Sequence, residues 1–275
     1  MDRGVIVVGV DGSAGSLDAL RWALPFAAAT DQQVAVVNVE AAPTTKPPPS
    51  QDTSRASSDA DRTAWLRELS DEALDGASDA VDVVIASGDT SEEILGEAAT
   101  RDASTIVVGA RGLGAIRGHL LGSVSRQCLR QSTRPVVVVP GGAPVTVPER
   151  ILVGVDGTTH AQRALLWAID LAHELDAEIV GVHAVGSEAV AAASTRLRER
   201  FHHEWCQPLR DAGVRHREVF AHDTARRELP RVADRVDAGL MVVGTRRRGT
   251  DRLPRLGSVA LNLAEHCRRP LAVVR

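Results

Sequence analysis

Val7-Val8-Gly9-Val10-Asp11-Gly12-Ser13 stands near the start of the chain, and Trp22 follows it. The stretch Leu152-Val153-Gly154-Val155-Asp156-Gly157-Thr158 repeats this pattern at an offset of 145 residues, with Trp167 at the same offset. Self-similarity over such a distance is the signature of a duplicated structural unit. The 275-residue sequence therefore predicts two copies of one domain.

The later part of each copy matches at an offset of 135 residues. The matched pairs are Ile106–Gly109 with Met241–Gly244, Leu121–Val124 with Leu256–Val259, and Arg134-Pro135 with Arg269-Pro270. A longer connection in the first copy, Pro43–Ser58, accounts for the shorter offset and is rich in Pro, Ser, Thr and Asp. We expect domains over residues 1–141 and 148–275, joined near Gly141–Glu149.

Short apolar runs alternate with helical patterns in both copies. A continuous run such as Val136–Val139 is typical of a strand buried on both faces of a parallel sheet. The alternation predicts a doubly wound α/β domain in each copy. The ten expected strands are 5–10, 34–39, 81–86, 105–109 and 135–139 in the first copy, and 150–155, 178–184, 215–220, 239–244 and 270–274 in the second.

Composition excludes several classes of chemistry. Lys46 is the only lysine, and it lies in a proline-rich stretch, so a P-loop and lysine-based covalent catalysis lose their central residue. The chain has no Tyr, three Phe and four Trp, which disfavours base-stacking platforms for nucleic acid. The formal net charge of −4 also disfavours nucleic-acid binding.

The cysteines and the apolar runs indicate an intracellular protein. Cys128, Cys206 and Cys267 show no metal-ligand spacing, and we expect buried, reduced thiols. The opening apolar run ends at Asp11 and is too short for a signal peptide, and no run has the length of a transmembrane helix. We expect a cytoplasmic protein that binds neither membrane nor nucleic acid.

A glycine-rich loop follows the fourth expected strand of the first copy. It runs from Gly109 to Ser123 and holds five glycines, the last of which is Gly122, where a helix is expected to begin. Open parallel sheets bind ligands at the carboxyl ends of their strands, and a helix N-terminus favours an anion. Arg111 and Arg117 would supply positive charge. The loop indicates phosphate binding, although a purely structural loop is the alternative.

Asp11 ends the first expected strand at the same edge of the sheet. Its carboxylate would accept hydrogen bonds from the ribose or base of a nucleotide, or it would form the turn and cap before the first helix. The sequence leaves these two roles open.

The spacing Gly109-x2-Gly112-x9-Gly122-Ser123 resembles the ATP-binding signature of the universal stress protein family, and the Val-Gly-Val-Asp-Gly-Ser opening resembles the same family. The closing Arg-Pro-Val-Val-Val-Val-Pro is similar as well, and the tandem arrangement resembles actinobacterial double-domain members. The resemblance implies a five-stranded parallel sheet of order 3-2-1-4-5 in each copy, with ATP, with or without Mg²⁺, across the strand ends. The first-copy residues that it places at the nucleotide are Gly9, Val10, Asp11, Val39, Gly109, Arg111, Gly112, Gly114, Gly122, Ser123 and Val124.

The second copy departs from this signature. Arg247 stands where the second signature glycine belongs, and if that position needs a positive φ the substitution costs about 1 kcal/mol or more. The arginine would block the pocket or reach the phosphates. The corresponding residues are Gly154, Val155, Asp156, Ala184, Gly244, Arg247, Gly249, Gly257, Ser258 and Val259. We expect ATP in both copies.

Four functions are weighed. The resemblance implies a regulator of stress response and growth that binds ATP and hydrolyses it slowly at most. It also implies that the protein is a homodimer and binds a regulatory protein partner. A nucleotide-using enzyme, a slow ATPase or adenylyl transferase, is the alternative, although the HxGH and SGGxDS signatures are missing. A response-regulator-like switch would need a lysine after the fifth strand, and neither copy has one there. A structural scaffold that has lost ATP binding is disfavoured by the intact Gly109–Ser123 loop. His202-His203 is expected on an exposed helix and not at a metal.

Overall fold

The computed structural model describes residues 4–41, 61, 63–68, 81–113, 121–186, 194–245, 256–266 and 268–275. The first half comprises β1 (Val5–Gly9), α1 (Ala14–Ala29), β2 (Gln33–Ala41), β3 (Val81–Gly88), α3 (Thr90–Thr100), β4 (Thr105–Gly109), α4 (Ser123–Gln131) and β5 (Val136–Val139). The second half comprises β6 (Arg150–Gly154), α5 (Thr159–Leu175), β7 (Glu178–Ala184), α6 (Ser194–Arg200), the π-helical turn η3 (Phe201–Trp205), α7 (Gln207–Asp211), β8 (His216–Ala221), α8 (Ala225–Arg235), β9 (Leu240–Gly244), α9 (Ser258–His266) and β10 (Leu271–Val274). Every expected strand is present, with ends that differ by at most two residues.

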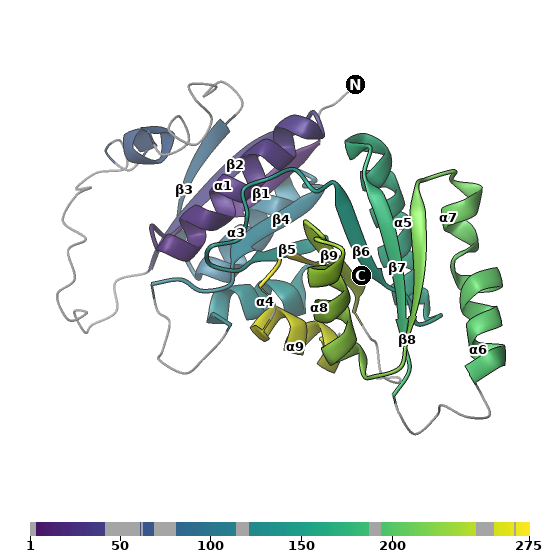
Figure 1. Ribbon diagram of the computed structural model, residues 1–275. Helices are drawn as coiled ribbons and strands as arrows, with labels where there is room; N and C mark the ends of the chain where they lie inside the picture. Colours follow the sequence, from purple (N-terminus) through teal and green to yellow (C-terminus); the bar gives the residue numbers. More distant parts are fainter. Residues whose placement is uncertain are drawn as a thin grey trace.

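The strands form one ten-stranded sheet in the order β3-β2-β1-β4-β5-β10-β9-β6-β7-β8. Within each half the neighbouring strands are parallel and follow the predicted order 3-2-1-4-5. Figure 1 shows the two halves side by side, with their fifth strands meeting in the middle of the molecule. The doubly wound fold predicted for each copy is confirmed.

The two halves join through the edges of their sheets. β5 and β10 are antiparallel, with Val138 opposite Leu271, Val137 opposite Ala272 and Val136 opposite Val273. The central pair, Val137 and Ala272, are equivalent positions of the two copies at the offset of 135. The chain therefore pairs its copies about a local two-fold axis, as a symmetric homodimer does. Sequence reasoning did not anticipate this seam.

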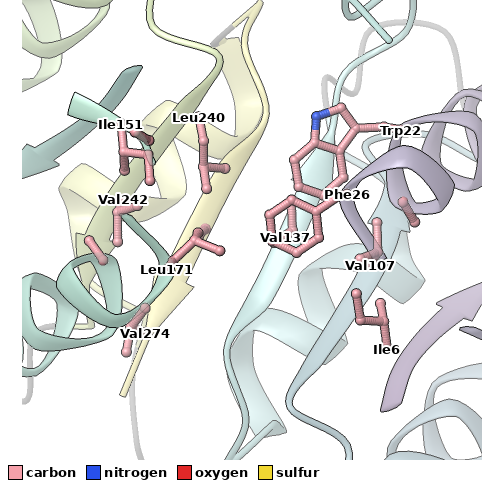
Figure 2. Packing of buried hydrophobic residues seen from close by; sticks show 14 of the residues in the cluster. Ile6, Trp22, Phe26, Val107, Val137, Ile151, Leu171, Leu240, Val242 and Val274 are labelled. Carbon is pink, nitrogen blue, oxygen red and sulfur yellow. The ribbon is translucent and has the colours of Figure 1, made fainter. Parts of the chain in front are cut away.

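Two apolar layers cover the sheet, and both run through the two halves. Side chains of α1 and α5 pack on one face, and those of α3, α4, α8 and α9 pack on the other. Successive strand residues alternate between the layers, so Ile6 and Val8 lie in one cluster and Val7 in the other. Figure 2 shows members of the first cluster, among them Trp22 beside Phe26. Aliphatic residues fill most of both layers, in agreement with the low aromatic content.

A tight Asp-Gly turn connects the first strand of each half to its helix. Gly12 and Gly157 have φ of +82° and +76°, a region that glycine occupies without strain. Ser13 and Thr158 then cap α1 and α5, because their hydroxyls accept hydrogen bonds from the N–H groups of Ser16 and Ala161. The repeated motif therefore starts the first helix of each half and aims its preceding aspartate at the edge of the sheet.

The structure also bears on several smaller predictions. Cys128 and Cys206 are buried free thiols, and burial raises the pKa of each to about 12, whereas Cys267 and the connection Pro43–Ser58 lie outside the described residues. His202 and His203 are exposed in η3, where His202 bonds Glu218. In the described part of the chain, no helix is long and apolar enough to cross a membrane.

Candidate functional site

A pocket lies at the carboxyl ends of β1 and β4, where parallel sheets bind ligands. Its cavity volume is about 100 Å³, below the range of roughly 300–1,000 Å³ that is usual for small-molecule sites. It is lined by Gly9, Val10, Asp11, Ser16, Val37, Val39, Thr90, Ile94, Val108, Gly109, Arg111, Gly112, Gly122, Ser123, Val124 and Ser125. The structure thus brings together every first-copy residue named from the sequence except Gly114, which lies outside the described residues.

The structure shows Asp11 in one of the two roles that the sequence left open, the formation of the turn before α1. Its Oδ1 accepts the N–H of Ser13 at 3.0 Å, which forms the turn. Its Oδ2 accepts the N–H of Leu113 at 2.9 Å, which draws the glycine-rich loop onto the strand end. Burial raises the pKa of Asp11, but the hydrogen bonds from Ser13, Leu113 and Ser16 outweigh it and the pKa falls below its ordinary value. The carboxylate is therefore charged at neutral pH and partly covered by the loop.

The loop glycines have different reasons for lacking a side chain. A Cβ at Gly109 would lie 2.4 Å from the carbonyl oxygen of Gly15 in α1, so this glycine lets helix and strand approach. A Cβ at Gly112 would lie 2.4 Å from Oδ2 of Asp11. Gly112 is not among the described glycines with positive φ, so the strain considered for Arg247 does not arise at the matching position. The restriction at Gly112 is one of space.

Gly122 differs from these two glycines, because a Cβ there would make only ordinary contacts. The nearest atom to a Cβ at this position would be the carbonyl oxygen of Ala110 at 3.4 Å, an ordinary contact. α4 begins directly after it, and Gly122 has no side chain that would cap the helix. The N–H groups of the first turn, with the hydroxyl of Ser123, are therefore disposed to bind an anion in the pocket.

A second pocket occupies the same position at the ends of β6 and β9. Its cavity volume is about 340 Å³, within the usual range for ligand sites. Its lining includes all of the described residues that the sequence assigned to it, namely Gly154, Val155, Asp156, Ala184, Gly244, Gly257, Ser258 and Val259. Arg247 and Gly249 lie outside the described residues. The second copy departs from the glycine signature, yet its cavity is larger than that of the first copy.

The second pocket differs from the first in chemistry. Ser16 and Ser125 of the first pocket are replaced at the matching offsets by Ala161 and Ala260. The second gains ring-bearing side chains that sequence reasoning missed: His160, His183 and Trp205. His183 could have been found from the sequence, because the offset of 145 residues aligns it with Asn38.

Neither pocket provides a metal centre from protein groups alone. Within the described ranges, no group of three or more His, Cys, Asp or Glu side chains is placed to hold a metal ion. Asp11, the sole carboxylate among the described lining residues of the first pocket, already accepts hydrogen bonds from two backbone N–H groups. A Mg²⁺ ion at this site would have to take most of its ligands from phosphate oxygens and water.

Comparison with known proteins agrees with this architecture. A crystal structure of a universal stress protein from Archaeoglobus fulgidus superposes with a TM-score of 0.75, covering 100% of this chain and 99% of that one. Because the two share 18% sequence identity, this likeness concerns the fold.

Relatives in sequence carry the same family name. A universal stress protein of Mycolicibacterium smegmatis is 29% identical over 293 residues, which cover 98% of this chain and 96% of that protein. Universal stress protein Rv2623 of Mycobacterium tuberculosis is 31% identical over 196 residues, which cover 64% of this chain and 63% of that protein. The sequence model of the Universal stress protein family matches residues 3–140 and 148–275. The chain belongs to the universal stress protein family, with two domains of that family in tandem.

Proposed function

We propose that this chain is a cytoplasmic ATP-binding regulator of stress response and growth, in which nucleotide occupancy sets conformation or the choice of a protein partner. The observation that carries the proposal is the open first turn of α4 at Gly122 and Ser123, facing the carboxylate of Asp11 across one pocket. Backbone N–H groups and a helix dipole bind phosphate without a lysine. A carboxylate accepts hydrogen bonds from ribose hydroxyls or from the amino group of a base.

The size of the first pocket sets a condition on this function. The cavity of about 100 Å³ is smaller than a nucleotide, and we propose that the segment at Arg111–Leu113 moves away from Asp11 when the ligand binds. That movement breaks the hydrogen bond between the Leu113 N–H and Oδ2 and frees the carboxylate for the ligand. Nucleotide binding is thereby coupled to the conformation of a surface loop, which is what a regulator needs.

An enzyme remains the second candidate, as a slow ATPase or adenylyl transferase. Asp11 and Arg111 are the ionisable side chains among the described residues lining the first pocket, which offers no acid–base pair. The second pocket holds His160 and His183 with Asp156, and these side chains favour the enzyme hypothesis there. We propose that hydrolysis, where it occurs, is slow. A turnover number of roughly 1–100 per second, which is typical of kinases, would contradict this proposal.

Equilibrium dialysis of the full chain against ATP tests the proposal. We expect two equivalents of bound nucleotide, one in each pocket. Gly122→Val and Gly257→Val fill matching positions at the two helix starts, so each should remove one equivalent while circular dichroism stays unchanged. A wild-type chain that binds no ATP would overturn the proposal, and one equivalent would overturn the two-site version.

A further inference from the structure

Asn38 and His183 occupy equivalent positions in the two halves, but their side chains differ in length. Each lies near the end of the second strand of its half, and each hydrogen-bonds the carbonyl oxygen that follows the first strand. Nδ2 of Asn38 donates to the Val10 carbonyl at 2.6 Å, and Nδ1 of His183 lies 2.6 Å from the Val155 carbonyl. His183 lines the second pocket, whereas Asn38 is not among the residues that line the first. The longer side chain extends the same anchor into a ligand cavity.

The anchor fixes the tautomer of His183. A carbonyl oxygen only accepts, so Nδ1 must carry the proton that it donates to Val155. In the neutral ring Nε2 is then an unprotonated acceptor. Within the described part of the chain Nε2 has no hydrogen-bond partner, and the only fully enclosed side-chain polar atom without one is Nε1 of Trp22. Nε2 is thus accessible, and the pocket is the space that the ring lines.

Aromatic rings hold the imidazole in place. Its centroid lies 5.0 Å from Trp205 in an edge-on arrangement, 5.7 Å from Phe201 and 5.5 Å from Phe220. His183 itself is 7% exposed. An acceptor held in a fixed orientation at the pocket wall favours a ligand that donates a hydrogen bond to it.

We propose that His183 recognises the base of the nucleotide in the second pocket, with Nε2 accepting a hydrogen bond from the exocyclic amino group of adenine. This inference rests on the proposed function for the class of ligand. It adds a residue that selects the base in one pocket, whereas its equivalent in the other half, Asn38, is not among the residues that line the first pocket. Ala184, the neighbour of His183, lines the same pocket and matches Val39 of the first.

The assignment makes the second pocket sensitive to pH. Burial lowers the pKa of His183, while the Val155 hydrogen bond and the charge of Asp156 oppose the shift. Among the described residues, the other charged or titratable groups near the ring are His160 of α5, Arg198 over Phe220, Arg200 over Trp205 and His222 against Phe220. The described residues of α8 that line the pocket are Ala225 and Leu229. As pH falls through the lowered pKa, Nε2 becomes a donor and faces the donating amino group, so binding weakens on the acid side.

The experiment isolates the second pocket by using the full chain with Gly122→Val. In this background, His183 is compared with His183→Asn, which installs the residue of the first half and keeps a donor for the Val155 carbonyl. Calorimetry measures binding of AMP and of purine riboside 5′-monophosphate, which lacks the amino group, at pH 7.5 and pH 5.0. Titration of the phosphate affects both proteins equally.

With His183 we expect AMP to bind about five- to tenfold more tightly than the amine-free analogue at pH 7.5, the loss expected for one hydrogen bond. AMP should also bind more weakly at pH 5.0 than at pH 7.5, by a larger factor than in the His183→Asn chain. His183→Asn should abolish both effects. Equal preference in the two proteins, or an empty second pocket in a chain whose first pocket still binds, would overturn the inference and leave the proposed function standing. Failure of the wild-type chain to bind any adenine nucleotide would overturn both.

Discussion

The glycine residues of the loop signature have different structural roles. Gly109 is a packing residue, because the backbone of α1 occupies the place where its side chain would lie. Gly244 repeats this in the second half, where a Cβ would meet the backbone of His160 at 2.4 Å. Gly122 instead borders the pocket, and a Cβ there would make only ordinary contacts. The two kinds can be separated by substitution.

Gly109→Ala should destabilise the fold by about 1–3 kcal/mol, the usual cost of forcing a methyl group into packed surroundings. Gly122→Ala, with 3.4 Å to its nearest neighbour, should cost less than about 1 kcal/mol and should instead weaken ATP binding at the first pocket. Urea unfolding and calorimetry on both variants check this. The opposite assignment, a stable Gly109→Ala with lost binding and an unstable Gly122→Ala, would show that the distinction is wrong.

At the scale of an element, α3 depends on a single capping side chain. Asp89 accepts hydrogen bonds from the N–H groups of Ser91 and Glu92, and the stretch Asp89-Thr90-Ser91-Glu92 is typical of a helix start. The hydrogen bond from Ser91 lowers the pKa of Asp89 below its ordinary value of 3.8. The charged cap therefore stabilises α3 above that pH, and the contribution is lost as pH falls through the lowered pKa. α3 lines the first pocket through Thr90 and Ile94.

Asp89→Ala should lower the free energy of unfolding by about 1 kcal/mol at pH 7, whereas Asp89→Asn, which also caps helices well, should cost little. Thermal unfolding monitored at pH 7 and again near pH 3 checks the prediction, because the gap between wild type and Asp89→Ala should narrow in acid. A gap that stays constant over this range would contradict the role of the carboxylate.

Strands and caps were predictable because their signals are local. Val136–Val139 is a buried strand in any parallel sheet, and Asp89-Thr90-Ser91-Glu92 caps whatever helix follows it. The partner of β5 was not predictable, because an all-valine strand packs equally well beside β10 of its own chain or β5 of another. The packing role of Gly109 was hidden for a similar reason, since it depends on a contact with α1. Homodimerisation of the full chain stays a prediction, but the β5 and β10 edges are already occupied by each other.

At the scale of the whole molecule, the seam should act as a binding interface between two separable halves. β5 and β10 pair along their backbones, Arg126 of α4 bonds Glu265 of α9 at 2.9 Å, and Arg275 reaches the Leu129 carbonyl. Figure 1 shows α4 and α9 close together on one side of this junction. An uncovered strand edge promotes pairing with another chain.

Residues 1–141 and 148–275, produced separately and then mixed, should form a 1:1 complex that light scattering detects by its mass. Arg126→Glu places two like charges together and should weaken the complex several-fold, since charge pairs of this exposure contribute roughly 0.2–1 kcal/mol. Adding Glu265→Arg should restore the affinity. Halves that stay monomeric when mixed at micromolar concentration would show that the seam contributes no independent affinity.

The local two-fold axis at Val137 and Ala272 has a consequence for how such a protein can change over evolutionary time. In a dimer of identical chains every substitution appears twice, so both ligand sites must change together. Fusion of the two copies removes that constraint while keeping the paired architecture. A serine can then become an alanine, and an asparagine a histidine, on one side alone. One molecule can thereby compare two chemical conditions, where a symmetric dimer would register the same one twice.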